Sequence, residues 1–212
     1  MSERLVGALI GVHGDDKGLV MPPGIAPIQA VIIPIISKNS AQDVAAYCAR
    51  LRDRLSAAGV RTKLDDRDAR PGSKYYDWEI KGVPVRLEVG ARDIENGVVS
   101  FCRRDTGEKG TISSDSVEPG VKMLLDVISE SMLAKAEEVQ KSRVQDIDSL
   151  EGIPEDKILR FGWCGSAECG HKFEDEHGFK ILGTPYVPEP FHGRCIICGA
   201  ETDKPAYAAH TM

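Results

Sequence analysis

Apolar and polar residues alternate with two different periods in the first half of the chain. Short β-branched or alternating runs predict strands at residues 29–36, 60–65, 83–89, 97–103 and 110–113. Apolar residues at helical spacing predict a helix between Ser40 and Gly59, and a turn at residues 71–73 predicts a short helix that continues to about residue 80. This order of elements predicts an α/β fold, with a mixed, roughly five-stranded sheet flanked by helices.

The pattern changes on either side of this sheet region. A long amphipathic helix is predicted to begin near Asp115 or Ser116, with Pro119 in its first turn. After about Arg160 the sequence becomes rich in Gly, Cys, His and Pro, which predicts a second, small α+β module. The run from Leu5 to Ile10 is predicted as one apolar strand, and Gly- and Pro-rich loops follow it up to residue 27.

Composition and charge narrow the possible functions. The 212 residues carry a net charge of −6, with 42% hydrophobic and 28% charged residues, which is typical of a soluble globular protein. This charge argues against binding nucleic acid by bulk electrostatics, so an RNA site would need a few specifically placed residues. Neither a membrane-spanning run nor the features of a signal peptide are found, so the expected location is the cytoplasm.

Four of the six cysteines form two close pairs near the end of the chain, Cys164-x4-Cys169 and Cys195-x2-Cys198. In a reducing compartment such pairs are more often metal ligands than disulfides, and four thiolates suit tetrahedral, structural zinc. Reduced thiols without a metal remain an alternative, as do His171, His177 and His192 as substitute ligands. Cys48 and Cys102 are expected in the core, because Cys48 falls on the apolar face of a predicted helix and Cys102 in a predicted strand.

Residues 4–35 resemble a specific junction in a known enzyme family. Arg4 is followed by the stretch GALIGVHGDDKGLVMPPGIAPIQAVIIPI, which resembles the end of class II motif 3 in prolyl-tRNA synthetase of the archaeal and eukaryotic type. The resemblance continues through EIKGVPVRLEVGARDIENG and RRDTGEK into the cysteine-rich tail. It therefore covers nearly the whole chain.

The resemblance implies a domain order. Residues 1–27 correspond to the tail of the catalytic domain, 28–113 to the anticodon-binding α/β domain, 114–160 to a long helix and linker, and 161–212 to a C-terminal zinc-binding domain. Arg4 takes the position of the motif 3 arginine that contacts ATP. Because motifs 1 and 2 are missing from the sequence, the chain alone is expected to be inactive in aminoacylation.

The resemblance also implies an RNA site. In the family, residues at the positions of Glu79, Arg86 and Asp93 recognise two adjacent guanines of the proline anticodon, and Arg92 and Lys109 are further candidates for contacts to base or phosphate. Carboxylates suit the N–H donors of guanine, and an arginine suits its acceptors. On residue types alone, Glu79, Arg86 and Asp93 could equally be a solvated set of salt bridges.

Other polar or aromatic residues are weaker candidates. Arg103 and Arg104 could contact phosphate, whereas Tyr75, Tyr76 and Trp78 could stack on bases but are more often core residues. Two groups of acidic residues could suggest a metal site or acid–base chemistry, but neither has the spacing of a known set of ligands. The first is Asp15 and Asp16, beside His13, and the second is Asp65, Asp66 and Asp68. The second acidic group is expected on the surface at a strand end.

The function predicted from these observations is tRNA selection within proline–tRNA ligase, which forms prolyl-tRNA from ATP, proline and tRNA. The implied partners are the anticodon loop of proline tRNA and the upstream catalytic domain, with a homodimer in the full-length enzyme; ATP is a substrate only there. Two alternatives are a non-catalytic RNA-binding module and a zinc-stabilised protein-interaction domain.

Overall fold

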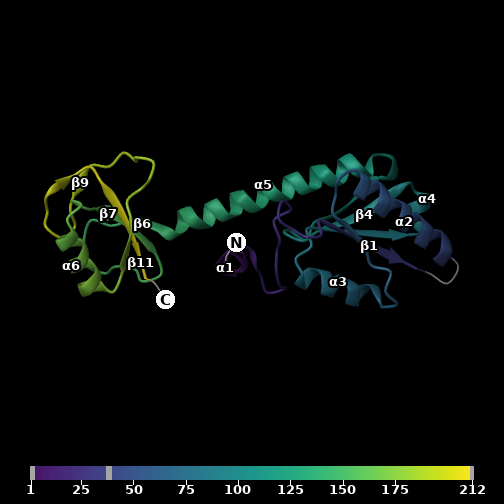
Figure 1. Cartoon of the computed structure of the whole chain (residues 1–212), viewed down its shortest axis with the longest axis horizontal. Helices are drawn as coiled ribbons and strands as arrows, with labels where there is room; N and C mark the ends of the chain where they lie inside the picture. Colours follow the sequence, from purple (N-terminus) through teal and green to yellow (C-terminus); the bar gives the residue numbers. More distant parts are fainter. Residues whose placement is uncertain (1–2, 37–39, 211–212) are drawn as a thin grey trace. The chain divides into compact units, whose positions relative to one another are not determined.

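The computed structural model describes residues 3–36 and 40–210, and residues 1–136 and 137–212 form two compact units (Figure 1). The sheet of the first unit contains five strands: β1 (Ala30–Ile35), β2 (Thr62–Leu64), β3 (Val85–Gly90), β4 (Val98–Arg103) and β5 (Lys109–Ser113). Their order is β2-β1-β3-β4-β5, in which β1 is parallel to β2 and β3, and β4 is antiparallel to β3 and β5. The predicted mixed α/β sheet is confirmed.

Helices cover the two faces of this sheet. They are α2 (Ala41–Ala57), α3 (Pro71–Ile80), α4 (Ala91–Glu95), the 3₁₀ turn η1 (Ser114–Ser116) and α5 (Val117–Arg143). Because successive residues of a strand point to opposite faces, Ile32 packs with α2 and α5 while Val31 packs against Trp78 of α3. The helix α4 was not predicted, since five residues are too few to show a helical period.

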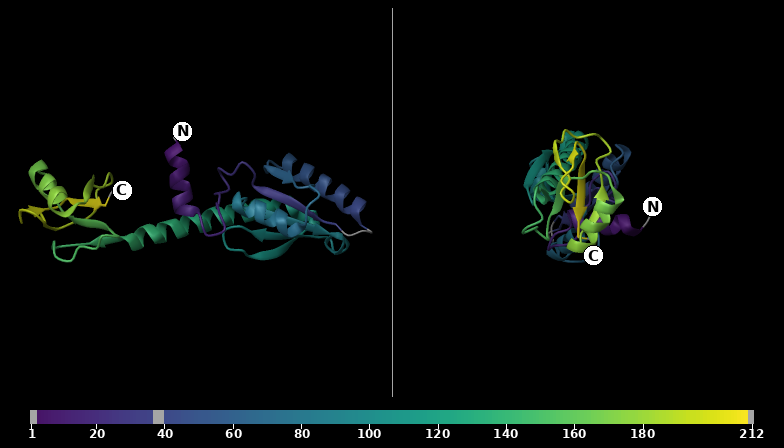
Figure 2. Two further views of the ribbon diagram at one scale, coloured as in Figure 1. Left: turned by 90° about the horizontal axis from the view of Figure 1, so that it is seen from below. Right: turned by 90° about the vertical axis from the view of Figure 1, so that its left-hand side faces the viewer.

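The first helix corrects one prediction. Residues Leu5 to Ile10, predicted as a strand, lie within the helix α1 (Glu3–His13), which buries none of its residues and projects from the first unit (Figure 2). A short apolar run does not show by its period alone whether it is a strand or a helix.

The second unit has its own sheet. Four strands, β6 (Val144–Asp146), β7 (Ile158–Gly162), β8 (Lys180–Gly183) and β11 (Pro205–Ala209), lie in the order β6-β7-β11-β8. The helix α6 (Ala167–His177) packs on it through Phe173, which contacts the ring of Phe161. A small hairpin is made by β9 (Gly193–Arg194) and β10 (Glu201–Thr202). The predicted α+β character of this region is confirmed, and residues 144–162 contribute two strands to it.

Candidate functional site

One face of the first sheet changes from apolar to polar along its width. On β1 this face carries Val31 and Ile33, which pack under α3. On the next strands the residues in register with Val31 are Arg86 of β3, then Cys102 of β4, then Lys109 of β5. The polar half of the face therefore lies beside α3, where side chains of the helix and of the sheet meet.

Arg86 is the centre of this polar half. Its side chain is only 10% exposed, yet it lies between two carboxylates: Nε donates to Glu88 Oε1 at 2.9 Å and a terminal nitrogen donates to Glu79 Oε1 at 3.3 Å. The guanidinium carbon also lies 4.0 Å from the centre of the Tyr75 ring. Tyr75 donates its hydroxyl hydrogen to the other oxygen of Glu88 at 2.9 Å. The structure thus brings Glu79 and Arg86 together.

A cavity of about 140 Å³ opens beside Arg86. Its walls come from segments that are far apart in sequence, namely the loop before β1, β1 itself, the end of α3, β3 and the β4–β5 hairpin. The residues lining it are Asp15, Lys17, Val31, Trp78, Glu79, Val83, Arg86, Cys102, Arg103, Arg104, Asp105, Thr106 and Gly107. The cavity therefore presents both carboxylate and guanidinium groups to anything that enters it.

Asp93 has a local role in the structure. It lies in the first turn of α4, where Oδ2 accepts the Gly90 backbone N–H at 2.8 Å and Oδ1 accepts the Ser100 hydroxyl at 2.7 Å. Within the described ranges, no hydrogen bond or ion pair joins Asp93 to the Glu79–Arg86 pair. Arg92 beside it is exposed, as is Lys109 on β5.

Arg103 and Arg104 are buried in ion pairs, which accounts for both side chains without RNA. Arg103 contacts Asp105 at 2.7 Å, and Arg104 holds the Asp15 carboxylate with two hydrogen bonds of 2.8 and 2.6 Å. Arg104 also donates through Nε to the backbone oxygen of Glu79 at 3.0 Å. Hydrogen bonding to Arg104 lowers the pKa of Asp15 to about 2. Arg104 thus joins the loop before β1, through Asp15, to the end of α3, through Glu79.

Asp65 is buried, so its predicted surface position is wrong. Only 2% of the residue is exposed, and its carboxylate accepts from Arg67 at 2.9 and 2.7 Å and from the indole N–H of Trp78 at 2.7 Å. Hydrogen bonds from Arg67, then from Trp78, hold the pKa of Asp65 well below its usual range, against the effect of burial. The Asp65 carboxylate therefore fixes the end of β2 to α3 through Trp78.

Replacing Asp65 with asparagine is expected to lower the free energy of unfolding by about 2 kcal/mol at neutral pH, because a charge-assisted buried hydrogen-bond network is lost. The folded pKa lies below the unfolded one, so this stabilisation is present above about pH 4 and is lost as the pH falls below it. Urea unfolding of wild type and Asp65→Asn between pH 7 and pH 3 measures both effects. Asp66→Asn changes the adjacent, exposed carboxylate and is the control; an equal loss in both variants would contradict the assignment.

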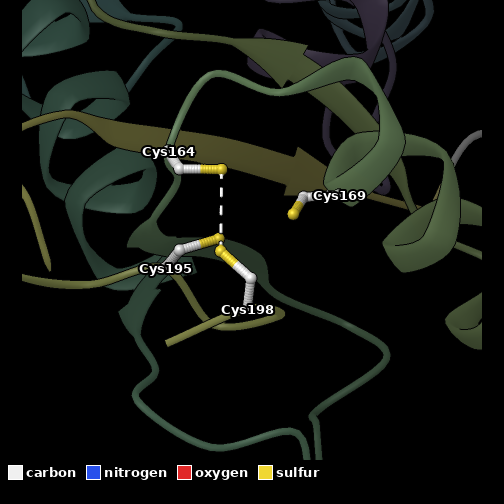
Figure 3. A group of neighbouring side chains, drawn as sticks. All are labelled: Cys164, Cys169, Cys195 and Cys198. Carbon is white, nitrogen blue, oxygen red and sulfur yellow. Dashed lines mark hydrogen bonds between the residues drawn. The ribbon is translucent and has the colours of Figure 1, made fainter. Parts of the chain in front are cut away.

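The second candidate site lies in the C-terminal unit. Cys164 follows β7, Cys169 lies in the first turn of α6, Cys195 follows β9, and Cys198 lies in the turn before β10. All four Sγ atoms lie within 4.8 Å of one another, and those of Cys164 and Cys198 are 3.9 Å apart. Figure 3 shows the four side chains pointing toward one another from these separate segments.

This geometry fits a tetrahedral metal. Bonds of about 2.3 Å from zinc to four sulfurs place the sulfurs about 3.8 Å apart, close to the separations found. Burial acts to raise the pKa of Cys195, but backbone N–H groups such as those of Cys198 and Ile197 lower it to about 6. Burial raises the pKa of Cys169 to about 12. A divalent cation would offset the cost of bringing these thiolates together.

The cysteines form this group without histidine. Across residues 3–36 and 40–210 no other set of three or more His, Cys, Asp or Glu side chains converges in this way. Cys48 and Cys102 are buried elsewhere, as expected.

Within residues 3–36 and 40–210 no helix is both long enough and apolar enough to cross a membrane.

Two residues of the Arg86 cluster escaped the sequence analysis. The sequence pattern indicates Tyr75 only as a stacking or core residue and gives no role to Glu88. The available signal was the spacing of Arg86 and Glu88, which places both on the same face of a strand.

Arg4 lies in α1 with its side chain exposed, and its contact with ATP stays a prediction.

Known proteins resemble both parts of the chain. Residues 29–124 match the family model "Anticodon binding domain", and residues 148–211 match "Prolyl-tRNA synthetase, C-terminal". The proline–tRNA ligase of Thermococcus kodakarensis is 46% identical over 220 residues, which cover 100% of this chain and 46% of that protein. Those of Methanosarcina mazei and Methanothermobacter thermautotrophicus are 46% and 43% identical over 100% and 95% of the chain, and 45% and 42% of their own lengths.

The fold and these matches define the class of protein as an anticodon-binding domain joined to a C-terminal domain with a four-cysteine cluster. The chain belongs to the prolyl-tRNA synthetase family and corresponds to the C-terminal part of its members. It spans slightly less than half the length of the curated relatives named above.

Proposed function

We propose that the chain selects tRNA for a proline–tRNA ligase by binding the anticodon loop of proline tRNA. The observation that carries this proposal is the buried Arg86, held beside Glu79 at a polar cavity in the segment that matches the anticodon-binding model. A buried arginine with donors facing a cavity suits recognition of a base edge.

The proposed RNA-binding residues supply complementary groups for guanine. Glu79 and Asp93 offer carboxylate acceptors to the N1–H and N2–H donors, and Arg86 offers donors to O6 and N7. Each oxygen of Asp93 accepts one hydrogen bond within the protein and has capacity for another. Arg92 and Lys109, which are exposed, are proposed to contact phosphate or base.

Removing the Arg86 side chain is expected to weaken discrimination between proline tRNA and a variant whose two anticodon guanines are changed. A bidentate contact to guanine contributes about 1–3 kcal/mol, so the ratio of the two dissociation constants should fall by about 5- to 150-fold in Arg86→Ala. The measurement is equilibrium binding of both RNAs at near-physiological salt, because phosphate contacts dominate at low salt.

The matched control is Arg52→Ala, which removes a partly exposed arginine of α2 on the opposite face of the sheet. It should leave the ratio unchanged. If the wild-type chain binds both RNAs equally, the anticodon role fails, and a zinc-stabilised protein-interaction domain becomes the better explanation.

We infer that Cys164, Cys169, Cys195 and Cys198 hold a structural zinc ion. Four thiolates fill a tetrahedral coordination sphere and leave no position open for a substrate or water. When bound, zinc would fix the β9–β10 hairpin to α6 and to the end of β7, so its role is to stabilise the C-terminal unit.

Catalysis is proposed to reside outside this chain. In the whole enzyme, Arg4 would contact ATP together with an upstream catalytic domain that contributes the remaining ATP site, the proline pocket and the dimer contacts. The chain alone is therefore expected to be inactive in aminoacylation, and the proposed location is the cytoplasm.

A further inference from the structure

Two residues outside the proposed recognition set fix the position of Arg86. Glu88 follows Arg86 by two positions on β3, so both side chains project from the same face of the sheet. The Glu88 carboxylate uses one oxygen to accept from Arg86 Nε at 2.9 Å and the other to accept from the Tyr75 hydroxyl at 2.9 Å. Three side chains from two elements thus form one closed cluster.

This cluster restricts the guanidinium group in two independent ways. The contact through Nε fixes one edge of the planar group, and the Tyr75 ring, 4.0 Å away, covers one of its faces. The remaining end carries the two terminal nitrogens, of which one makes only a 3.3 Å contact to Glu79. Arg86 is one of the residues that line the cavity, and within the described residues this end of the guanidinium has donors left for a ligand.

The charges around Arg86 favour a base over a phosphate. Two carboxylates, Glu79 and Glu88, contact one buried guanidinium, so the cluster has no excess positive charge. A phosphate would meet two carboxylates, whereas a neutral base with two acceptors gains hydrogen bonds without that repulsion. Burial, followed by hydrogen bonding to Glu88, raises the pKa of Tyr75, so its hydroxyl stays a donor at neutral pH.

We propose that Tyr75 and Glu88 are positioning residues that set the base specificity of the site by holding Arg86 in the orientation that suits O6 and N7 of guanine. This inference rests on the proposed anticodon function. Adenine presents an N6 donor where guanine presents the O6 acceptor, so a correctly oriented arginine rejects it. An arginine free to rotate would tolerate the change better.

The test uses Tyr75→Phe, which keeps the ring and removes only the hydroxyl bond to Glu88. The measured quantity is the ratio of dissociation constants of the 212-residue chain for two anticodon stem-loops, one with the proline anticodon and one with its guanines changed to adenines. Tyr75→Phe is expected to reduce this ratio about fivefold, the typical net effect of losing one hydrogen bond. Glu88→Ala should reduce it further, and Glu88→Gln, which keeps an acceptor for Arg86, should restore much of it.

A double-mutant cycle distinguishes positioning from a direct contact. If Tyr75 acts through Arg86, then Tyr75→Phe has no effect on the ratio when Arg86 is already alanine. Tyr47→Phe is the matched control, since it removes a hydroxyl bond of 2.7 Å to Ser114 on the opposite side of the sheet. Thermal unfolding of each variant checks that the fold is retained.

Two results would overturn the inference. One is an unchanged ratio in Tyr75→Phe while the wild type still discriminates, which leaves the anticodon function intact. The other is an equal effect of Tyr75→Phe in the presence and absence of the Arg86 side chain, which assigns Tyr75 a contact of its own. A wild type without discrimination would instead reject the proposed function, and this inference with it.

Discussion

Replacing Cys195 with serine is expected to unfold residues 137–212 and to leave the first unit folded. Cys195 is only 2% exposed, and its Sγ is one of four that converge within 4.8 Å. The apolar core of this unit is small, with four large buried side chains, namely Leu159, Phe161, Phe173 and Phe179. Structural zinc contributes about 10–16 kcal/mol to the folding of small domains, so a core of this size is not expected to replace it.

Metal analysis and limited proteolysis measure this result. The wild type should carry one zinc per chain, whereas Cys195→Ser should lose the metal and have residues 137–212 digested while the first unit resists. Prolonged chelation of the wild type should give the same digestion pattern. Cys102→Ser, which changes a buried thiol of the first unit, is the control and should keep its zinc. A wild type that resists protease without bound metal would contradict the structural role.

The sheet of the first unit could be predicted because its strands and helices have clear periods. Buried residues of α2, such as Val44, Leu51 and Leu55, recur at helical spacing, and β3 alternates between its two faces. The prediction of a strand within α1 is wrong because the apolar residues between Leu5 and Ile10 form a nearly continuous run, whose period does not distinguish a strand from a helix. The strands of the C-terminal unit are two to five residues long, too short to show a period.

The candidate sites differ in how far the sequence determines them. Four cysteines in two close pairs have few alternatives to a shared metal, and the structure brings them together. Charged residues have many possible partners, so the sequence did not show that Asp65 is buried or that Arg104 binds Asp15. Which ion pairs form depends on contacts between segments far apart in the chain, as the pair of Arg104 and Asp15 illustrates.

Gly82 joins α3 to β3, and its substitution is expected to have the second largest effect. Its φ of +71° suits glycine, and a Cβ atom there would lie 2.5 Å from the backbone oxygen of Leu19 and 2.7 Å from its carbonyl carbon. Two backbone hydrogen bonds hold residues 19–21 against residues 80–82, so neither segment can move away freely. Leu19 N–H donates to Ile80 O and Met21 N–H donates to Gly82 O, each at 3.1 Å. This close packing of Leu19 on Gly82 also holds the loop before β1 against the end of α3, which carries Glu79.

Gly82→Ala is therefore expected to lower the free energy of unfolding of the first unit by at least about 3 kcal/mol, from backbone strain together with a steric clash. Gly59→Ala separates the two causes, because Gly59 has a φ of +87° but no atom within 4 Å of the added Cβ. That control should cost about 1 kcal/mol, from strain alone. Urea unfolding of both variants measures the difference, and equal costs would show that the loop before β1 yields to the added methyl group. In that case the position of Glu79 relative to Arg86 would not depend on the packing of this loop, and Gly82→Ala should retain full discrimination in the RNA-binding assay.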